Sequence, residues 1–193
     1  MKNNLFIFLL LAGIASNAQQ RQFKIGDTLQ CGIVFHIEKD TFNRQHILIA
    51  SMKDQSASIA WYNGQFVSTF ATRDILFDRG NAENVIRVQG NGIYAATLCR
   101  NFSLNDSTCA TRDSLWYLPS VSELKLMYQV LDSSGRLSFA KEGYWSSVEF
   151  ADENNPRKTK QKKAMIVDFF NGRSISNNKS NKYHVRAIRE FIN

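Results

Sequence analysis

The segment WYLPSVSEL, residues 116–124, constrains the fold more than any other part of the chain. An aromatic and apolar run meets Pro119, and Ser120 then stands three residues before Glu123, which is the pattern of a capping box at the start of a helix. Apolar residues follow at steps of three and four through Leu131, as one face of an amphipathic helix requires. The sequence therefore predicts a buried strand end that runs into a capped helix. Because capping accounts for the Glu123 carboxylate without any chemistry, we assign it a structural role.

The first 18 residues have the pattern of a secretory signal peptide. Lys2 precedes an apolar run from Leu5 to Ile14, and Ser16-Asn17-Ala18 supplies small residues at the positions that a signal peptidase reads. The apolar run is too short for a comfortable membrane span, and no later stretch approaches about 18 apolar residues. We expect a mature chain that begins near Gln19 and is exported to the periplasm, the cell surface or the medium.

The mature chain is about the size of one domain of the usual 100–200 residues. With aromatic residues at 12% and only two prolines, it has the composition of a folded domain. No internal repeat or linker divides it. We therefore interpret residues 1–18 as the signal peptide, 19–25 as a short lead and 26–193 as one domain.

Much of the formal net charge of +7 comes from one short basic segment after Pro156. A charge run of this kind most often solvates a loop, but it also offers cationic groups to a polyanion. A basic balance alone gives salt-dependent attraction to nucleic acid without specificity, and the export signal argues against that partner, so we expect no specific nucleic acid ligand. The basic residues are Arg157, Lys158, Lys160, Lys162 and Lys163.

Three cysteines remain after export, an odd number in a compartment where disulfides persist. Cys99 and Cys109 flank a polar stretch that reads as a loop, and a bridge between them would contribute up to about 3 kcal/mol in the chain-entropy model. We predict that pairing, with Cys31 as a small buried hydrophobe, although a bridge from Cys31 to either other cysteine is left open. The three histidines have no ligand spacing with the cysteines, so we expect no metal and no cofactor.

The apolar patterns along the chain predict a single α+β domain with helices on an antiparallel sheet. Between 56 and 80, residues 59–62 are strand-like, and the remainder is expected to form long loops packed down by aromatic side chains. The predicted helices cover 81–98, interrupted by Gly90 and Gly92, and the segment after Ser120. The predicted strands are a hairpin of 32–37 with 46–50, then 143–148, then 164–170 turning at Asn171-Gly172, and last 183–189.

Two tryptophans and two arginines receive structural predictions. Trp116 and Trp145 fall in strand-like motifs, so we expect both in the core. Arg186 and Arg189 differ by three positions and would point to opposite faces of a strand. We expect one of them to pair with a buried carboxylate such as Asp168 and the other to be solvated.

Five segments, in their order along the chain, resemble the DUF1566 family, which is named for the C-terminal domain of the Legionella collagen-like adhesin. The match covers about Gly26 to Ile192, and it is the order of the segments that makes it specific. The segments are Gly32-Ile-Val-Phe with Ile47-Leu-Ile-Ala, Gly92-Ile-Tyr-Ala-Ala-Thr-Leu-Cys99, Trp116-Tyr-Leu-Pro-Ser-Val-Ser-Glu-Leu124, Tyr144-Trp-Ser-Ser147 and Val185-Arg-Ala-Ile-Arg189.

The resemblance implies a C-type-lectin-like fold, with two helices packed on a twisted antiparallel sheet, the two ends of the domain together and a long irregular region that presents the binding surface. Family members are exported or surface-exposed, and the adhesin that names the family binds sulfated glycosaminoglycans. The Glu-Pro-Asn, Gln-Pro-Asp and Trp-Asn-Asp motifs of calcium-dependent lectins are not found in this sequence. Fold similarity does not carry function by itself.

Three functions remain as hypotheses from the sequence. The first is an exported, non-enzymatic module that binds a polyanionic or polar glycan through the basic segment and through Trp61 and Tyr62, if these rings are exposed rather than in the core. The alternative is a structural or protein-binding component of a surface assembly. A remote third is an enzyme similar to formylglycine-generating enzymes, which would need redox-active cysteines.

Overall fold

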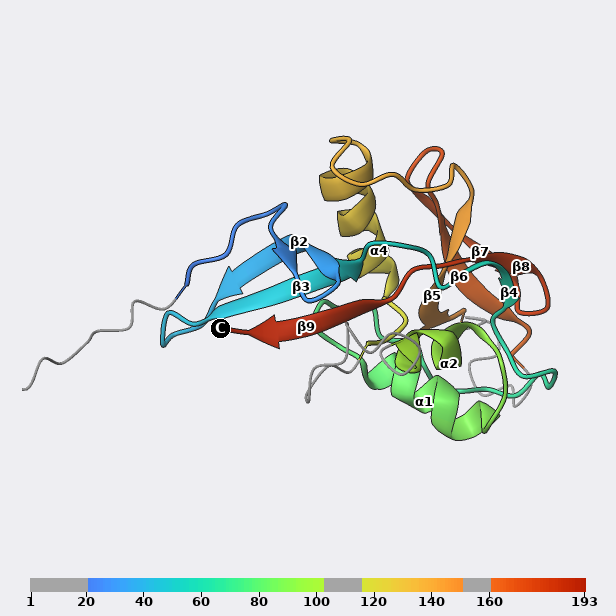
Figure 1. Ribbon diagram of the computed structural model, residues 1–193. Helices are drawn as coiled ribbons and strands as arrows, with labels where there is room; N and C mark the ends of the chain where they lie inside the picture. The colour runs from blue at the N-terminus through green and yellow to red at the C-terminus, as the bar shows by residue number, and fades with distance from the viewer. Residues whose placement is uncertain (1–20, 103–115, 151–160) are drawn as a thin grey trace, which may run out of the picture.

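Two β-sheets that follow one another along the molecule form the frame of the fold (Figure 1). The computed structural model describes residues 21–102, 116–150 and 161–193. The strand order is β1-β2-β3-β9 in the first sheet and β4-β8-β5-β6-β7 in the second. The predicted α+β class is thus confirmed, but the single predicted sheet is divided into two. The signal peptide, Cys109, Arg157, Lys158 and Lys160 lie outside the described residues.

The first sheet is built on the predicted hairpin of β2 (Gly32–Lys39) and β3 (Gln45–Ser51). β3 is apolar and almost wholly buried, and it pairs on its other side with β9 (Ile188–Ile192). β1 (Thr28–Leu29) adds a short edge. The side chain of Asn193 donates to the carbonyl of Arg21, so the first and last described residues meet.

The second sheet contains β4 (Ser56–Ala60), β5 (Gly143–Glu149), β6 (Lys163–Asp168), β7 (Arg173–Asn178) and β8 (Lys182–Val185). Its pairs are antiparallel except that β5 and β8 run parallel. The predicted final strand 183–189 is wrong as one element, because β8 lies in the second sheet and β9 in the first. Arg186 and Ala187 carry the chain from one sheet to the other.

The predicted turn between β6 and β7 is confirmed, and its glycine has a clear reason. Gly172 has a φ of 73°, in the left-handed region that glycine adopts without strain. A Cβ atom there would lie only 2.6 Å from the ring of Tyr128. The hairpin therefore packs its backbone directly on an aromatic side chain.

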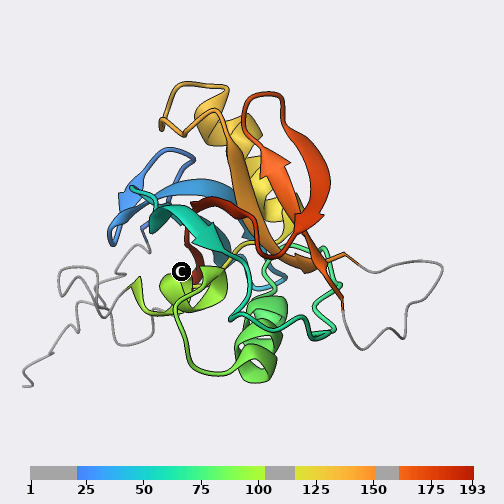
Figure 2. The same cartoon turned by 90° about the vertical axis from the view of Figure 1, so that its right-hand side faces the viewer.

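Three α-helices of the described residues lie on opposite sides of this frame (Figure 2). α1 (Gly80–Gln89) and α2 (Ala95–Arg100) are on one side. α4 (Val121–Met127) is on the other side and continues into the π-helical turn η1 (Tyr128–Asp132). The predicted helix 81–98 is two helices, because α1 ends at Gly90 with a φ of 72° and α2 begins only after Tyr94.

The segment 116–124 connects both sheets with α4. This position explains why its sequence pattern constrains the fold. The Tyr117 N–H donates to the carbonyl of Ile188 in β9 at 2.8 Å. The Ser147 N–H of β5 donates to the carbonyl of Pro119 at 2.7 Å. The predicted capping box is confirmed: Ser120 Oγ accepts from the Glu123 N–H at 3.2 Å, and Glu123 Oε2 accepts from the Ser120 N–H at 2.8 Å.

The core predictions for the tryptophans are confirmed, whereas the arginine prediction is correct only in that one arginine pairs with a carboxylate. Trp116 and Trp145 are buried, and Trp145 Nε1 donates to the carbonyl of Ile59 at 2.9 Å. Arg186 and Arg189 are both buried, because the chain leaves the strand conformation between them. Neither is solvated, and the carboxylate that Arg186 contacts is Asp54 rather than Asp168.

The predicted bridge between Cys99 and Cys109 is wrong, because Cys99 is a free thiol. Cys99 lies on α2 and faces the core, where burial raises its pKa well above the ordinary value for a thiol. Cys31, in the turn between β1 and β2, is disulfide-bonded and is not the buried hydrophobe we expected.

No helix in the described ranges is long and apolar enough to cross a membrane.

Candidate functional site

The long loop of residues 61–79, between β4 and α1, is held by two buried carboxylates. Phe70 and Phe77 in this loop have φ values of 55° and 56°, a left-handed conformation that costs a residue with a side chain about 1–2 kcal/mol. The backbone N–H of Phe70 donates to Glu149, and that of Phe77 donates to Glu123. These contacts hold both phenylalanines in a conformation that the sequence alone would disfavour.

Glu149, at the end of β5, is the centre of the first anchor. Its Oε2 accepts from Ser68 Oγ at 2.9 Å, from the Thr69 N–H at 3.0 Å and from the Phe70 N–H at 3.2 Å. Its Oε1 forms an ion pair with Lys179, which follows β7. Both side chains are almost completely removed from water, with exposed fractions of 1% for Glu149 and 0% for Lys179.

Lys179 completes this anchor from the opposite side. Its Nζ donates to the carbonyl of Val67 at 3.1 Å and lies 4.6 Å from the ring centroid of Trp61. Burial lowers the pKa of Lys179, and the Glu149 carboxylate opposes that effect. Because a buried charge without its partner is costly, the ion pair fixes residues 67–70 against β5.

The first anchor brings the Phe70 backbone to the end of β5, beside the residue that precedes Phe150. Phe70 is 70% exposed although its backbone is fixed, and Phe150, directly after Glu149, is partly exposed. Lys163 Nζ lies 6.0 Å from the Phe150 ring centroid. The neighbouring Lys162 is exposed, and its carbonyl accepts from the Lys179 N–H at 2.8 Å. We call Phe70, Phe150, Lys162 and Lys163 the aromatic–basic edge.

The structure divides the ligand-binding residues that the sequence suggested. Lys162 and Lys163 are exposed. Trp61 is fully buried and donates from Nε1 to the carbonyl of Ser146 at 2.8 Å, so its prediction as an exposed sugar-stacking ring is wrong. Tyr62 is half-buried and stacks on Phe66 with ring centroids 4.8 Å apart.

Sequence analysis missed Phe70 and Phe150. Both are single aromatic residues in polar surroundings, and no periodic pattern distinguishes them from core residues. The available signal was weak: Phe70 lies in the long loop, and Phe150 stands seven positions before Arg157, the first residue of the basic segment. Only the long-range contact between Glu149 and the Phe70 N–H shows that the Phe70 backbone lies beside the end of β5, where Phe150 follows.

Glu123 provides the second anchor of the loop. Besides capping α4, its Oε1 accepts from the Phe77 N–H at 3.0 Å and from the Tyr117 hydroxyl at 2.8 Å. Burial raises the pKa of Glu123 to about 7, although these hydrogen bonds favour the ionised form. The Phe77 ring packs near the rings of His36 and His46 on the first sheet.

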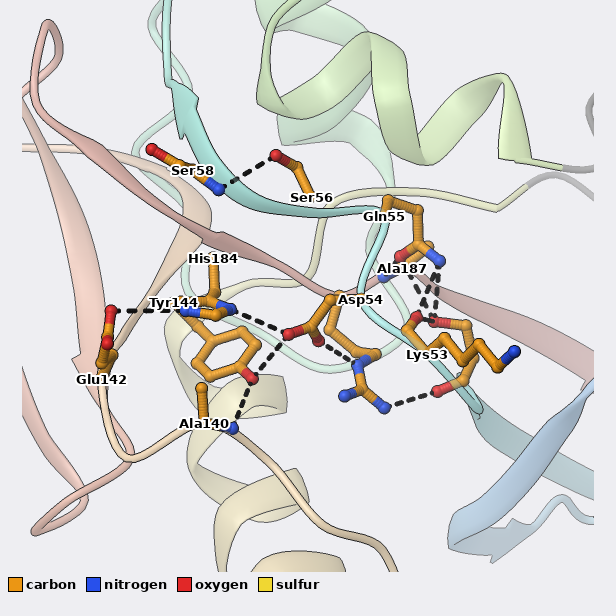
Figure 3. A network of polar contacts seen from close by, with 12 residues as sticks. Lys53, Asp54, Gln55, Ser56, Ser58, Ala140, Glu142, Tyr144, His184 and Ala187 are labelled. Carbon is orange, nitrogen blue, oxygen red and sulfur yellow. Dashed lines mark hydrogen bonds and ion pairs between the residues drawn. The ribbon is translucent and has the colours of Figure 1, made fainter.

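A third polar cluster surrounds Asp54 where the chain passes between the sheets (Figure 3). Asp54 Oδ1 accepts from Arg186 Nε at 2.6 Å. Asp54 Oδ2 accepts from the Tyr144 hydroxyl at 2.9 Å and lies 2.9 Å from His184 Nδ1. His184 Nε2 lies 3.3 Å from Glu142 Oε2. The cluster thus joins the turn before β4 to β5, β8 and the β8–β9 connection.

The Asp54 cluster has a structural explanation. A histidine oriented by an aspartate occurs in hydrolases, where its other nitrogen faces a nucleophile. Here that nitrogen faces Glu142, and no serine or cysteine contacts His184 within the described part of the chain. Burial, together with the nearby Asp54 carboxylate, raises the pKa of Tyr144. The cluster therefore ties the two sheets together.

Two other features of the described ranges bear on where a ligand could bind. No group of three or more His, Cys, Asp or Glu residues there could hold a metal ion. An apolar cavity between α1, α2 and Trp116 has a volume of about 40 Å³. Small-molecule sites are usually several hundred Å³, roughly ten times larger, so a sugar ring does not fit there.

In comparisons with known proteins, no family model matches the chain, and no curated protein matches it. The family resemblance of the five sequence segments therefore stays a prediction.

Proposed function

We propose that this chain is an exported, non-enzymatic binding domain that recognises a polyanionic or polar glycan at the aromatic–basic edge. The observation that carries the proposal is Phe70. Its ring is mostly exposed, yet its backbone is held in a left-handed conformation by a buried carboxylate. Strained residues that their surroundings over-determine are concentrated at functional sites.

The chemistry of the edge suits a charged sugar. A rigid aromatic ring offers an apolar face at low entropy cost to the C–H side of a pyranose. The ammonium groups of Lys162 and Lys163 attract sulfate or carboxylate groups, and this attraction weakens as salt is added. Arg157, Lys158 and Lys160 precede these lysines in the sequence and would add to the same positive field.

We also propose that the fold is C-type-lectin-like and that the chain belongs to the DUF1566 family. Three observations support this: helices pack beside largely antiparallel strands, the two ends of the described chain meet, and one long irregular loop presents an exposed aromatic residue. The proposal of export rests on the signal-like sequence of residues 1–18.

The test is binding of the mature Gln19–Asn193 protein to immobilised sulfated and neutral glycans at low and raised salt. We expect salt-sensitive binding to the sulfated members. Replacing Lys162 and Lys163 by serine should weaken binding and flatten its salt dependence. The same change at two other exposed lysines, Lys24 before β1 and Lys39 at the end of β2, should not. If the folded protein binds no glycan, the proposal is wrong.

A variant with Arg157, Lys158 and Lys160 replaced by serine separates the two parts of the basic segment. A further loss of binding would show that the whole segment contributes. No loss would confine the site to the described lysines and Phe70. If the wild-type protein instead retains a protein from the same surface and no glycan, the alternative function as a component of a surface assembly replaces this one.

A further inference from the structure

The ion pair of Lys179 and Glu149 holds two groups of complementary chemistry in contact. One is a primary amine and the other a carboxyl group, and both are buried in contact with each other. The Trp61 ring lies on one side of the amine, and the carbonyl of Val67 accepts from it on another. Bulk water is therefore excluded from the only two groups that could condense here.

We propose that Lys179 and Glu149 become joined by an intramolecular amide bond between Nζ and Cδ, with release of one water. This is a covalent modification of the protein by itself, without a cofactor or a second substrate. It does not depend on the ligand-binding function proposed above, because it concerns how the loop is fixed and not what the loop contacts.

The first requirement is an uncharged amine, because an ammonium group has no lone pair with which to attack. Burial lowers the pKa of Lys179 and so favours the neutral amine. Transfer of a proton from Lys179 to Glu149 converts two buried charges into an amine and a carboxylic acid, which removes the desolvation cost of both ions. The reaction therefore begins with the transfer of this one proton within the buried pair.

The second requirement is a set of donors for the oxyanion of the tetrahedral intermediate. Glu149 Oε2 already accepts from the N–H groups of Thr69 and Phe70 at 3.0 and 3.2 Å and from Ser68 Oγ at 2.9 Å. Donors that are fixed before the reaction stabilise developing negative charge most effectively in a dry site. The loop that presents Phe70 thereby supplies the groups that the reaction needs.

Each bond that forms in this reaction is matched by a bond that breaks within the Lys179–Glu149 pair. The Nζ lone pair attacks Cδ of the carboxylic acid, and the electrons of the Cδ–Oε2 double bond move to Oε2, where the loop donors hold the charge. A proton passes from the now cationic Nζ to the Oε1 hydroxyl. The Cδ–Oε1 bond breaks, water leaves, and the double bond to Oε2 re-forms. The product is a neutral amide that retains one hydrogen on nitrogen.

Because Nζ of Lys179 and the Glu149 carboxyl group are held in contact, the amide can form even if the reaction is slow. Groups held in contact in a suitable geometry react as if at effective concentrations of about 10⁵–10⁸ M. Each molecule needs to react only once after folding. The product would covalently tie the end of β5 to the turn between β7 and β8, and with it the segment 67–70.

The test is the mass of the mature wild-type protein after reduction and denaturation. We expect a species lighter than its sequence by one water. Trypsin should then release a branched peptide in which residues 142–157 are joined to residues 174–182 through Glu149 and Lys179. Cyclisation of an amino-terminal Gln19 or of an Asn-Gly step releases ammonia instead, and the peptide map separates these reactions from the proposed one.

The matched control is Lys179→Arg, which keeps the positive charge beside Glu149 but offers a guanidinium that remains protonated. This variant should have its full sequence mass and give separate peptides, with its fold checked by circular dichroism. The wild-type result decides the proposal even if the variant fails to fold. If wild-type protein keeps its full mass and gives separate peptides after prolonged incubation at physiological temperature, the contact is an ion pair only and the proposal is overturned.

Discussion

The buried carboxyl of Glu123 predicts that stability falls as pH rises towards neutrality. Burial raises the pKa of Glu123 from 4.5 to about 7 in the folded protein. The folded state therefore binds this proton more tightly than the unfolded chain does. The resulting stabilisation is fully present below pH 4.5, the value for the unfolded chain, and is lost as pH rises through about 7.

The magnitude follows from the size of the shift. The step from 4.5 to about 7 is roughly 2.5 units, and at roughly 1.4 kcal/mol per unit it corresponds to about 3 kcal/mol of unfolding free energy. Ionised Glu123 still accepts from Ser120, Phe77 and Tyr117, so the loop anchor remains formed at neutral pH but is less stable.

Glu123→Gln isolates this effect. The amide is neutral at every pH and nearly the same size, but it cannot accept all three hydrogen bonds, so we expect a pH-independent loss of about 1–2 kcal/mol. Urea unfolding followed by tryptophan fluorescence at pH 5, 6, 7 and 8 would measure both proteins, and all other titrating groups cancel in the difference. Only the wild-type protein should lose stability towards pH 8 through this group. Equal pH profiles for the two proteins would refute the reasoning.

Three further predictions test the packing, each by urea unfolding. Lys179→Met leaves Glu149 buried without its cation and should cost about 3–5 kcal/mol; a loss below about 1 kcal/mol would mean that the pair does not anchor the loop. Gly172→Ala should cost more than Gly64→Ala, because both glycines have positive φ but only the Cβ at 172 would meet a ring; equal losses would contradict that contact. Trp145→Ala should cost about 3–5 kcal/mol, and unchanged stability would remove this residue from the core.

Structural features that depend only on residues close together in the sequence could be predicted from it. The capping box needs only Ser120 and Glu123, and both sides of it formed as expected. The β2–β3 and β6–β7 hairpins depend on apolar strands that flank a short turn, and they too are present. Local hydrogen bonding and strand pairing decide these elements without help from distant residues.

Features that depend on distant partners could not be predicted. The final strand divides in two where Arg186 turns to Asp54, which is 132 positions away in the sequence. Cys99 is free because α2 directs it into the core, which loop length between cysteines does not reveal. Spacing alone could not show that the carboxylate beside Arg186 would be Asp54, or that Arg189 would be buried as well.

The candidate site shows the same division. Lys162 and Lys163 were found because charge runs are visible in a sequence. The prediction of Trp61 as a ligand-binding residue was wrong, because its ring is buried in contact with Ser146 and Lys179. Neither of these residues is close to Trp61 in the sequence. Glu149, 79 positions later in the sequence, fixes the backbone of Phe70, whose ring is exposed. The basic residues of the aromatic–basic edge could therefore be predicted from the sequence, whereas its aromatic residues could not.

The measurement that tests the central claim most directly compares Phe70→Ser with Phe42→Ser. Both rings are largely exposed, but Phe42 lies at the β2–β3 turn of the other sheet, so the two changes remove similar apolar surface from different places. The affinity of each variant and of the wild-type protein for one sulfated glycan would be measured by titration calorimetry. We predict a loss of at least about tenfold for Phe70→Ser, as for a residue at the centre of a binding surface, and no change for Phe42→Ser. Equal affinities for all three proteins would contradict the assignment of the aromatic–basic edge as the ligand site.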